Sequence, residues 1–183
     1  MHKAIFLDRD GVIIEQKPHH YKINETVFIP GVFEALQLAQ EAGYKLIIIT
    51  NQAGIAKQKY TEQDYHTLMS WMGSIFSAEG ILFDAVYYCP HHPDGVLEQY
   101  RKICDCRKPN PGLLHQAIRE KGVDISRSFM IGDQTWDILA GKRVGCKTIL
   151  VQTGYGGKDG KYEVDPDYVA ADLKDAIHFI LKS

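Results

Sequence analysis

The stretch AIFLDRDGVI, residues 4–13, contains the two features from which the fold of this 183-residue chain can be predicted. The apolar run at residues 4–7 has the length and continuity of a strand buried on both faces. It ends in Asp8, and a second acid, Asp10, follows after one residue. Two neighbouring carboxylates repel each other and resist burial. We therefore expect either a compensating positive charge or a chemical role at the end of this strand.

Further apolar runs of strand length alternate along the chain with segments of helical period. The predicted strands are residues 4–7, 44–50, 83–89, 128–132 and 147–152. The predicted helices lie within residues 29–43, 61–80, 110–122, 136–145 and 170–183. This alternation is typical of the α/β class with a doubly wound, mostly parallel sheet. We expect a single domain over residues 1–183, since no repeat, low-complexity tract or linker interrupts the pattern.

Residues with strong terminal preferences mark the ends of several predicted helices. Thr61 is the expected N-cap of the second helix, and Asn110 followed by Pro111 is expected to open the third. Gly43 and Gly122 follow helical segments and are expected to end them. Two long loops remain, at residues 12–29 and 89–109, and loops of this length in a compact domain are often functional.

The composition is that of an ordinary globular protein, with 45% hydrophobic and 24% charged residues. The net charge of -2 gives no general attraction to nucleic acid or to a membrane surface, so neither is expected as a partner. No apolar run approaches the ~18 residues of a membrane helix, and the opening residues lack a signal-peptide pattern. We therefore expect a cytoplasmic enzyme, acting as a monomer on a small molecule.

Polar residues cluster where the predicted strands end, and ligands of such sheets bind beyond those ends. The first strand ends in Asp8 and Asp10, the second in Thr50 and Asn51, and the fourth is followed by Asp133. The pair Arg107 and Lys108 precedes the third helix. This edge of the sheet therefore combines carboxylates, a hydroxyl, an amide and two cations.

That set of groups suits phosphoryl transfer. One carboxylate can attack phosphorus, and a second can protonate the leaving oxygen and later activate water. Mg²⁺ prefers oxygen ligands and would offset the repulsion among Asp8, Asp10 and Asp133. A lysine neutralises charge on the phosphoryl oxygens, while Thr50 and Asn51 supply hydrogen bonds.

The four motifs, in this order, resemble those of the haloacid dehalogenase (HAD) superfamily of aspartate-nucleophile phosphatases, and the match spans essentially the whole chain. The resemblance implies that Asp8 is the nucleophile and Asp10 the general acid and base. It implies that Thr50 and Lys108 stabilise the phosphoryl group. The implied Mg²⁺ ligands are Asp8, the backbone carbonyl of Asp10, and Asp133. Asp137 resembles a further acid of this family, which more often supports the site than binds the metal.

The loop CPHHPDGVLEQYRKICDC, residues 89–106, carries a second chemical pattern. Cys89, His91, Cys104 and Cys106 offer three sulfurs and one nitrogen, a set that suits Zn²⁺ in a closed, structural site. His92 is an alternative to His91. A disulfide is disfavoured in a reducing compartment. Zinc would order a long loop that leads directly into the two cations at residues 107–108.

This zinc loop resembles that of the D-glycero-D-manno-heptose-1,7-bisphosphate 7-phosphatase group, and the related histidinol-phosphate phosphatases share a similar loop. The resemblance implies hydrolysis of a heptose 7-phosphate in nucleotide-activated heptose synthesis, on a chain without an inserted cap domain. Arg107 resembles the group's substrate-recognition residue. Further substrate contacts are expected from five other polar side chains: Lys17, His19, Asn51, Gln52 and Gln134.

Two alternatives to that function remain open from the sequence. The chain could hydrolyse histidinol phosphate or another small sugar phosphate, because the stretch at residues 14–20 departs from the heptose group's pattern. It could also be a non-catalytic binding module on the same scaffold. The intact pair of Asp8 and Asp10 argues against a binding module, which has no need for both acids.

Overall fold

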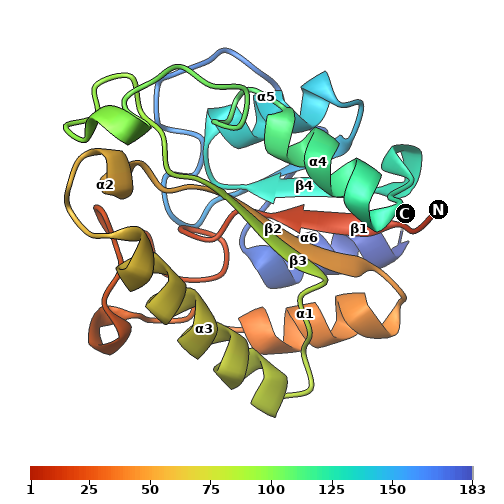
Figure 1. Cartoon of the computed structure of the whole chain (residues 1–183). Coiled ribbons are helices and arrows are strands. Elements are labelled where there is room, and N and C mark those ends of the chain that lie inside the picture. The colour runs from red at the N-terminus through yellow and green to blue at the C-terminus, as the bar shows by residue number, and fades with distance from the viewer. Residues whose placement is uncertain (183) are drawn as a thin grey trace.

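Six parallel strands form one sheet in the computed structural model, which describes residues 1–182 (Figure 1). The strand order is β3-β2-β1-β4-β5-β6, and every neighbouring pair is parallel. The strands are β1 (Ala4–Leu7), β2 (Lys45–Asn51), β3 (Ala85–Cys89), β4 (Phe129–Gly132), β5 (Lys147–Val151) and β6 (Tyr168–Ala170). The order reverses direction at β1 and β4, so their carboxyl ends form the topological switch point at which such sheets bind ligands.

Helices cover both faces of this sheet (Figure 1). One face is covered by α1 (Val32–Glu41), α3 (Glu62–Ala78) and α6 (Leu173–Lys182). The other face is covered by α4 (Gly112–Lys121) and α5 (Thr135–Arg143). The shorter helices are α2 (Ala53–Ala56) and the 3-10 helices Ile23–Glu25, Glu98–Tyr100 and Ile125–Arg127.

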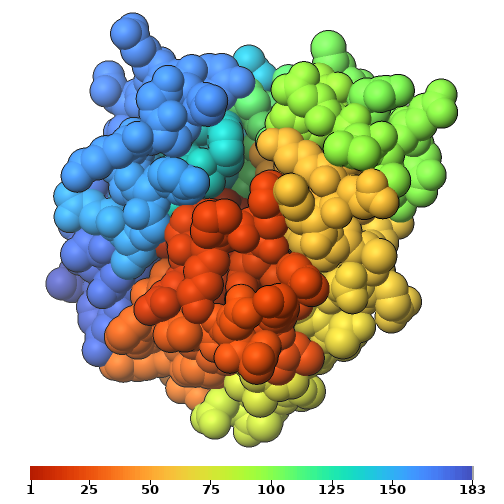
Figure 2. Space-filling model, turned by 90° about the vertical axis from the view of Figure 1, so that its left-hand side faces the viewer, coloured from red at the N-terminus to blue at the C-terminus, as the bar shows by residue number. Residues whose placement is uncertain are grey.

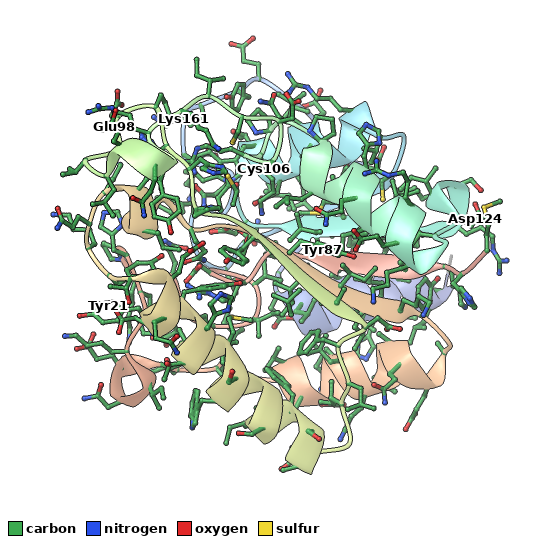
Figure 3. The ribbon with its side chains drawn as sticks, viewed as in Figure 1. Tyr21, Tyr87, Glu98, Cys106, Asp124 and Lys161 are labelled. Carbon is green, nitrogen blue, oxygen red and sulfur yellow. The ribbon has the colours of Figure 1, made fainter. Side chains whose placement is uncertain are left out.

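The alternation of side chains along β1 explains why this strand is apolar at every position. Ile5 and Leu7 pack in the core beneath α1, α3 and α6, whereas Ala4 and Phe6 pack in the core beneath α4. All four side chains are completely buried. Complete burial of a large aliphatic or aromatic side chain stabilises the fold by about 1.5–3 kcal/mol, so both cores anchor the central strand. Tyr87, labelled in Figure 3, belongs to the second core and donates a hydrogen bond of 2.7 Å to Glu120 of α4.

The predicted doubly wound parallel sheet is confirmed, and the element boundaries agree within a few residues. The capping box at Thr61 and Asp64 is present, and Gly122 ends α4 in the left-handed region at φ 61°. The expected N-cap at Asn110 is wrong, because Pro111 occupies that position. The Asn110 side chain instead donates to the carbonyl of Cys104, which ties the start of α4 to the preceding loop.

Besides the 3-10 helices of residues 1–182, the sequence did not predict α2 or the edge strand β6. The segment proposed as a helix over residues 170–183 begins with the last residue of β6, and Ser183 lies outside the described residues. Among residues 1–182, no helix combines the length and the apolar character needed to cross a bilayer.

Candidate active site

The carboxyl ends of the strands surround a cavity of about 290 Å³. Figure 2 shows this side of the molecule, with a hollow where the red, orange and cyan segments meet. The predicted site residues that line the cavity are Asp8, Asp10, Lys17, His19, Asn51, Gln52, Arg107 and Gln134. Thr50, Lys108 and Asp133 are almost completely buried beside it. The fold therefore gathers the predicted residues from four separate stretches of the chain.

Lys108 lies at the centre of a buried cluster of charges. Its Nζ lies 3.0 Å from Asp8 Oδ1 and 2.6 Å from Asp137 Oδ1, and it donates to the carbonyl of Ile49 at 2.7 Å. Burial disfavours the ammonium, yet the charges of Asp137 and Asp8 raise the pKa of Lys108 above its ordinary value. The charged form of Lys108 is therefore favoured next to the predicted nucleophile, as its predicted role in neutralising charge on a phosphoryl group requires.

In their ionised forms, the three carboxyl groups around Lys108 would carry more negative charge than one ammonium can neutralise. Oxygens of Asp8, Asp133 and Asp137 lie within 4.8 Å of one another, and all three residues are buried. Burial, followed by the charges of Asp137 and Asp8, raises the pKa of Asp133 to about 9. Burial likewise raises the pKa of Asp8, against the opposing charge of Lys108. Such a site favours the binding of a further cation.

Asp133 and Asp137 differ in the contacts that they already make. Asp133 Oδ2 accepts a hydrogen bond from the backbone N–H of Tyr155, while its Oδ1 is buried and has no hydrogen-bond partner within residues 1–182. Asp137 is occupied by Lys108 and by the backbone N–H of Gln134. A buried carboxylate oxygen without a partner, beside a second carboxylate at Asp8, fits a hard divalent cation such as Mg²⁺. These contacts favour Asp133 as a metal ligand and Asp137 as a supporting residue.

The residues at the end of β2 hold the site together from the opposite side. Asn51 donates to the carbonyl of Lys108 at 3.1 Å and accepts from its backbone N–H at 3.0 Å. Gln52 donates to the hydroxyl of Thr50 at 2.9 Å and to Asp10 at 3.1 Å. Asn51 and Gln52 line the cavity, and much of their hydrogen-bonding capacity is used within the protein.

The loop residues that were expected to contact substrate lie around the cavity mouth. Lys17 and His19 line the cavity, and Lys17 donates to the carbonyl of Glu25. His19 adopts a left-handed backbone conformation at φ 52°, which is uncommon for a residue other than glycine and is often found at functional sites. Arg107 donates to the carbonyl of His91 at 3.4 Å, which links the cavity to the cysteine loop.

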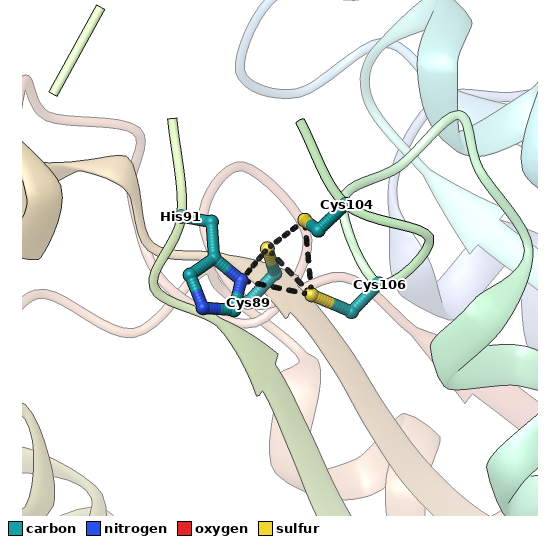
Figure 4. Close-up of side chains that lie close together, drawn as sticks. All are labelled: Cys89, His91, Cys104 and Cys106. Carbon is teal, nitrogen blue, oxygen red and sulfur yellow. Dashed lines mark hydrogen bonds between the residues drawn. The ribbon is translucent and has the colours of Figure 1, made fainter. Parts of the chain in front are cut away.

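That loop brings the four predicted zinc ligands together (Figure 4). The Cys106 sulfur lies 3.1 Å from that of Cys89, 3.2 Å from that of Cys104 and 3.2 Å from His91 Nδ1. Tetrahedral zinc with Zn–S bonds of about 2.3 Å needs sulfurs only slightly farther apart. All four cysteines of the chain are free, so no disulfide competes.

The chemistry of the cluster also fits a metal. Hydrogen bonds with Cys89, Cys104 and His91 lower the pKa of the Cys106 thiol to about 5, and the thiolate is the form that binds zinc. The ring of His92 accepts a hydrogen bond from the backbone N–H of Asp94, so the structure favours His91 as the nitrogen ligand. Cys146, the fourth cysteine, is buried elsewhere in the core.

Comparisons with known proteins identify the family. A family model described as "Haloacid dehalogenase-like hydrolase" matches residues 5–68, and one described as "HAD-hyrolase-like" matches residues 105–176. D-glycero-beta-D-manno-heptose-1,7-bisphosphate 7-phosphatase of Pasteurella multocida is 44% identical over 177 residues, which cover 96% of this chain and 95% of the relative. This chain belongs to the haloacid dehalogenase-like hydrolases.

Other relatives place this hydrolase in the same group. The proteins of that name from Vibrio cholerae and Escherichia coli K12 are 39% and 42% identical, over 98% and 82% of the chain and 96% and 80% of the relatives. A crystal structure of D,D-heptose 1,7-bisphosphate phosphatase from B. bronchiseptica, complexed with magnesium and phosphate, superposes with a TM-score of 0.87 at 30% identity. That match covers 98% of each chain. The resemblance stated from the motifs is thereby confirmed.

The structure also brings into the hydrolase's site several residues that sequence reasoning missed. Arg9 is 1% exposed and binds Asp10 through both carboxylate oxygens. Lys57, Tyr60 and Tyr155 line the cavity. Arg9 could have been recognised from the sequence. An arginine at the end of a buried strand needs an acidic partner, and Arg9 has an acid on each side. Lys57, Tyr60 and Tyr155 stand in no recognisable motif, and only the fold brings them to the cavity.

Proposed function

We propose that this protein is a Mg²⁺-dependent phosphatase that removes the 7-phosphate of D-glycero-D-manno-heptose 1,7-bisphosphate. The observation that carries the proposal is the buried pair of Asp8 and Lys108, 3.0 Å apart, at the base of a cavity lined by further cations. The names of its relatives supply the sugar.

In the first half-reaction, an Asp8 oxygen attacks the phosphorus of the 7-phosphate. The ester bond between phosphorus and the sugar oxygen breaks, and Asp10 gives its proton to that oxygen. Lys108 and the Thr50 hydroxyl face the phosphoryl oxygens, where negative charge develops. Asp8 then carries the phosphoryl group as a mixed anhydride.

In the second half-reaction, Asp10 takes a proton from water, which attacks the phosphorus. The bond between phosphorus and Asp8 breaks, so inorganic phosphate leaves and both carboxyl groups return to their starting states. Asp8, the carbonyl of Asp10 and Asp133 would hold Mg²⁺. The bound ion supplies positive charge that reduces repulsion between the substrate phosphate and the attacking carboxylate.

Cations at the cavity mouth suit a substrate with a second phosphate. Arg107, Lys57 and Lys17 line the cavity in addition to the groups at its base, and the ring of His19 adds a hydrogen-bonding group. Arginine binds phosphate through a two-pronged hydrogen-bonding arrangement, so Arg107 is placed to recognise the 1-phosphate. Zinc held by Cys89, His91, Cys104 and Cys106 would order the loop that positions Arg107, without taking part in the chemistry.

The test is phosphate release from a panel of substrates with Mg²⁺ and with EDTA. The panel contains both anomers of the heptose bisphosphate, histidinol phosphate, fructose 1,6-bisphosphate and p-nitrophenyl phosphate. We expect the highest Mg²⁺-dependent kcat/KM on one heptose anomer. A higher value on histidinol phosphate would refute the proposed substrate, and no release from any compound would refute the phosphatase activity.

A further inference from the structure

The carboxylate of Asp10 is held by a buried network of hydrogen bonds that the proposed reaction does not itself explain. Arg9 Nε donates to Asp10 Oδ2 at 3.1 Å, and Arg9 Nη2 donates to Asp10 Oδ1 at 3.0 Å. Gln52 Nε2 donates to the same Oδ2 at 3.1 Å. The Asp10 side chain is 16% exposed, so one side remains open to the cavity. Three donors therefore fix the orientation of this carboxylate.

A second layer of contacts fixes the donors themselves. Gln52 Oε1 accepts hydrogen bonds from Arg9 Nη2 and from the Tyr60 hydroxyl. An amide that accepts on its oxygen presents its nitrogen to the opposite side, where it donates to Asp10 and Thr50. Arg9 Nη2 can only donate, so it determines which way the Gln52 amide faces, and the Tyr60 hydroxyl adds a second hydrogen bond to the same oxygen and helps to hold Gln52 against Asp10.

The backbone makes room for this arrangement. A Cβ atom on Gly54 would lie 2.1 Å from the ring of Tyr60, so the ring reaches Gln52 only because residue 54 has no side chain. The ring of Tyr21 stacks on the ring of Tyr60, with centroids 5.2 Å apart. Figure 3 places Tyr21 on the side of the molecule where the strands end. The loop that follows β1 therefore holds Tyr60 in place.

Arg9 joins the same loop to the network, because its Nη2 also donates to the carbonyl of His20 at 3.1 Å. The guanidinium is 1% exposed, and the side chain spans Asp10, Gln52 and the loop at once. A buried arginine with this many partners is a rigid element, because its planar fork fixes the direction of each hydrogen bond.

We propose that Arg9, Gln52 and Tyr60 are positioning residues that hold the Asp10 carboxyl in the orientation needed for proton transfer to the leaving oxygen. The inference rests on the proposed function, since it takes Asp10 to be the general acid. Proton transfer depends steeply on the geometry of donor and acceptor. Loss of this hydrogen-bond network should therefore slow cleavage most for substrates whose leaving oxygen needs a proton.

The leaving group separates this role from a general structural one. The alkoxide of a sugar leaves only with a proton, whereas p-nitrophenolate is stable as an anion and leaves without one. We compare the parent with Tyr60→Phe, which removes the hydroxyl and keeps the ring. The control is Tyr65→Phe, because the Tyr65 hydroxyl is buried nearby but has no hydrogen-bond partner among the described residues.

The measurement is the single-turnover rate of heptose bisphosphate cleavage and the burst rate of p-nitrophenolate release, both with Mg²⁺. We expect Tyr60→Phe to slow the sugar substrate about five- to tenfold, the effect of one hydrogen bond. Its burst rate with the aryl substrate and its KM should stay within about twofold of the parent. Tyr65→Phe should leave both rates unchanged.

Arg9→Lys gives an independent test, because lysine keeps the charge and loses the fork. We expect it to show the same difference between substrates as Tyr60→Phe, with circular dichroism confirming the fold. An equal loss of rate on both substrates, or no loss on either, would refute the positioning role of these residues, while the parent would remain a phosphatase. A parent that cleaves neither substrate would instead refute the proposed function.

Discussion

Lys108→Met removes the ammonium that lies 3.0 Å from Asp8 and 2.6 Å from Asp137, both buried. Removal of one partner of a buried ion pair costs about 3–5 kcal/mol, because the remaining charge has no compensation. We therefore expect the free energy of unfolding, measured with urea in EDTA, to fall by that amount. With Mg²⁺ present, the loss of a group that stabilises transition-state charge should lower kcat about 100- to 1,000-fold.

The pH dependence of the loss in unfolding free energy follows from the pKa values of the neighbouring carboxyl groups. Burial raises the pKa of Asp137 to about 7 from its ordinary value of 3.8, and loss of Lys108 would raise it further. A carboxyl whose pKa is raised in the folded state lowers stability as the pH rises from the unfolded pKa to the folded one. This interval extends to higher pH in the variant, so the difference from the parent should be larger at pH 8 than at pH 6.

Lys142→Met is the matched control for Lys108→Met. Lys142 forms an ion pair of the same length, 2.6 Å, with Asp167, but its side chain is 35% exposed and that of Asp167 is 43% exposed. Exposed pairs contribute about 0–1 kcal/mol, so this variant should lose little stability and no activity. Equal losses in the two variants, or a neutral Lys108→Met, would refute the assignment of Lys108 to a buried electrostatic centre.

Two further predictions concern the metal-binding loop and the loop over Asp133. Metal analysis should find zinc in the parent and in the control Cys146→Ser, but not in Cys104→Ser. The KM of Cys104→Ser should also rise, because the loop that carries Arg107 loses its order. Retention of zinc by Cys104→Ser would contradict the metal site. Gly154→Ala should abolish turnover, since its Cβ would lie 2.1 Å from Asp133 Oδ2. The control is Gly160→Ala, because Gly160 has nearly the same φ as Gly154, 62° against 63°, and open space where a Cβ would lie. This control should retain turnover. Equal losses of activity in the two variants would attribute the effect to backbone strain alone.

The sequence was sufficient to predict the sheet because buried parallel strands are apolar at consecutive positions, as at Ala4–Leu7. The edge strand β6 escaped prediction for the opposite reason. Tyr168–Ala170 is three residues long, and Val169 at its centre is 46% exposed. A short edge strand needs no continuous apolar pattern, and it forms only because β5 offers it hydrogen-bonding groups.

The site was predictable where its residues follow strands and unpredictable where tertiary contacts bring them in. Asp8 and Asp133 follow β1 and β4, so topology alone places them together. Tyr60 reaches Gln52 through the space above Gly54, which no spacing rule describes. The long loop at residues 12–29 was suspected of a role in specificity, but its packing of Tyr21 on Tyr60 depends on the fold.

The central claim is that Asp8 becomes phosphorylated during turnover, and a rapid acid quench tests it most directly. The heptose bisphosphate, labelled in its 7-phosphate, is mixed with the protein and Mg²⁺, quenched within one turnover, and digested for mass spectrometry. The account predicts a phosphoryl group on the peptide that contains Asp8, and none in Asp8→Asn. Phosphate release by Asp8→Asn at the parent rate, or label on a different residue, would contradict it.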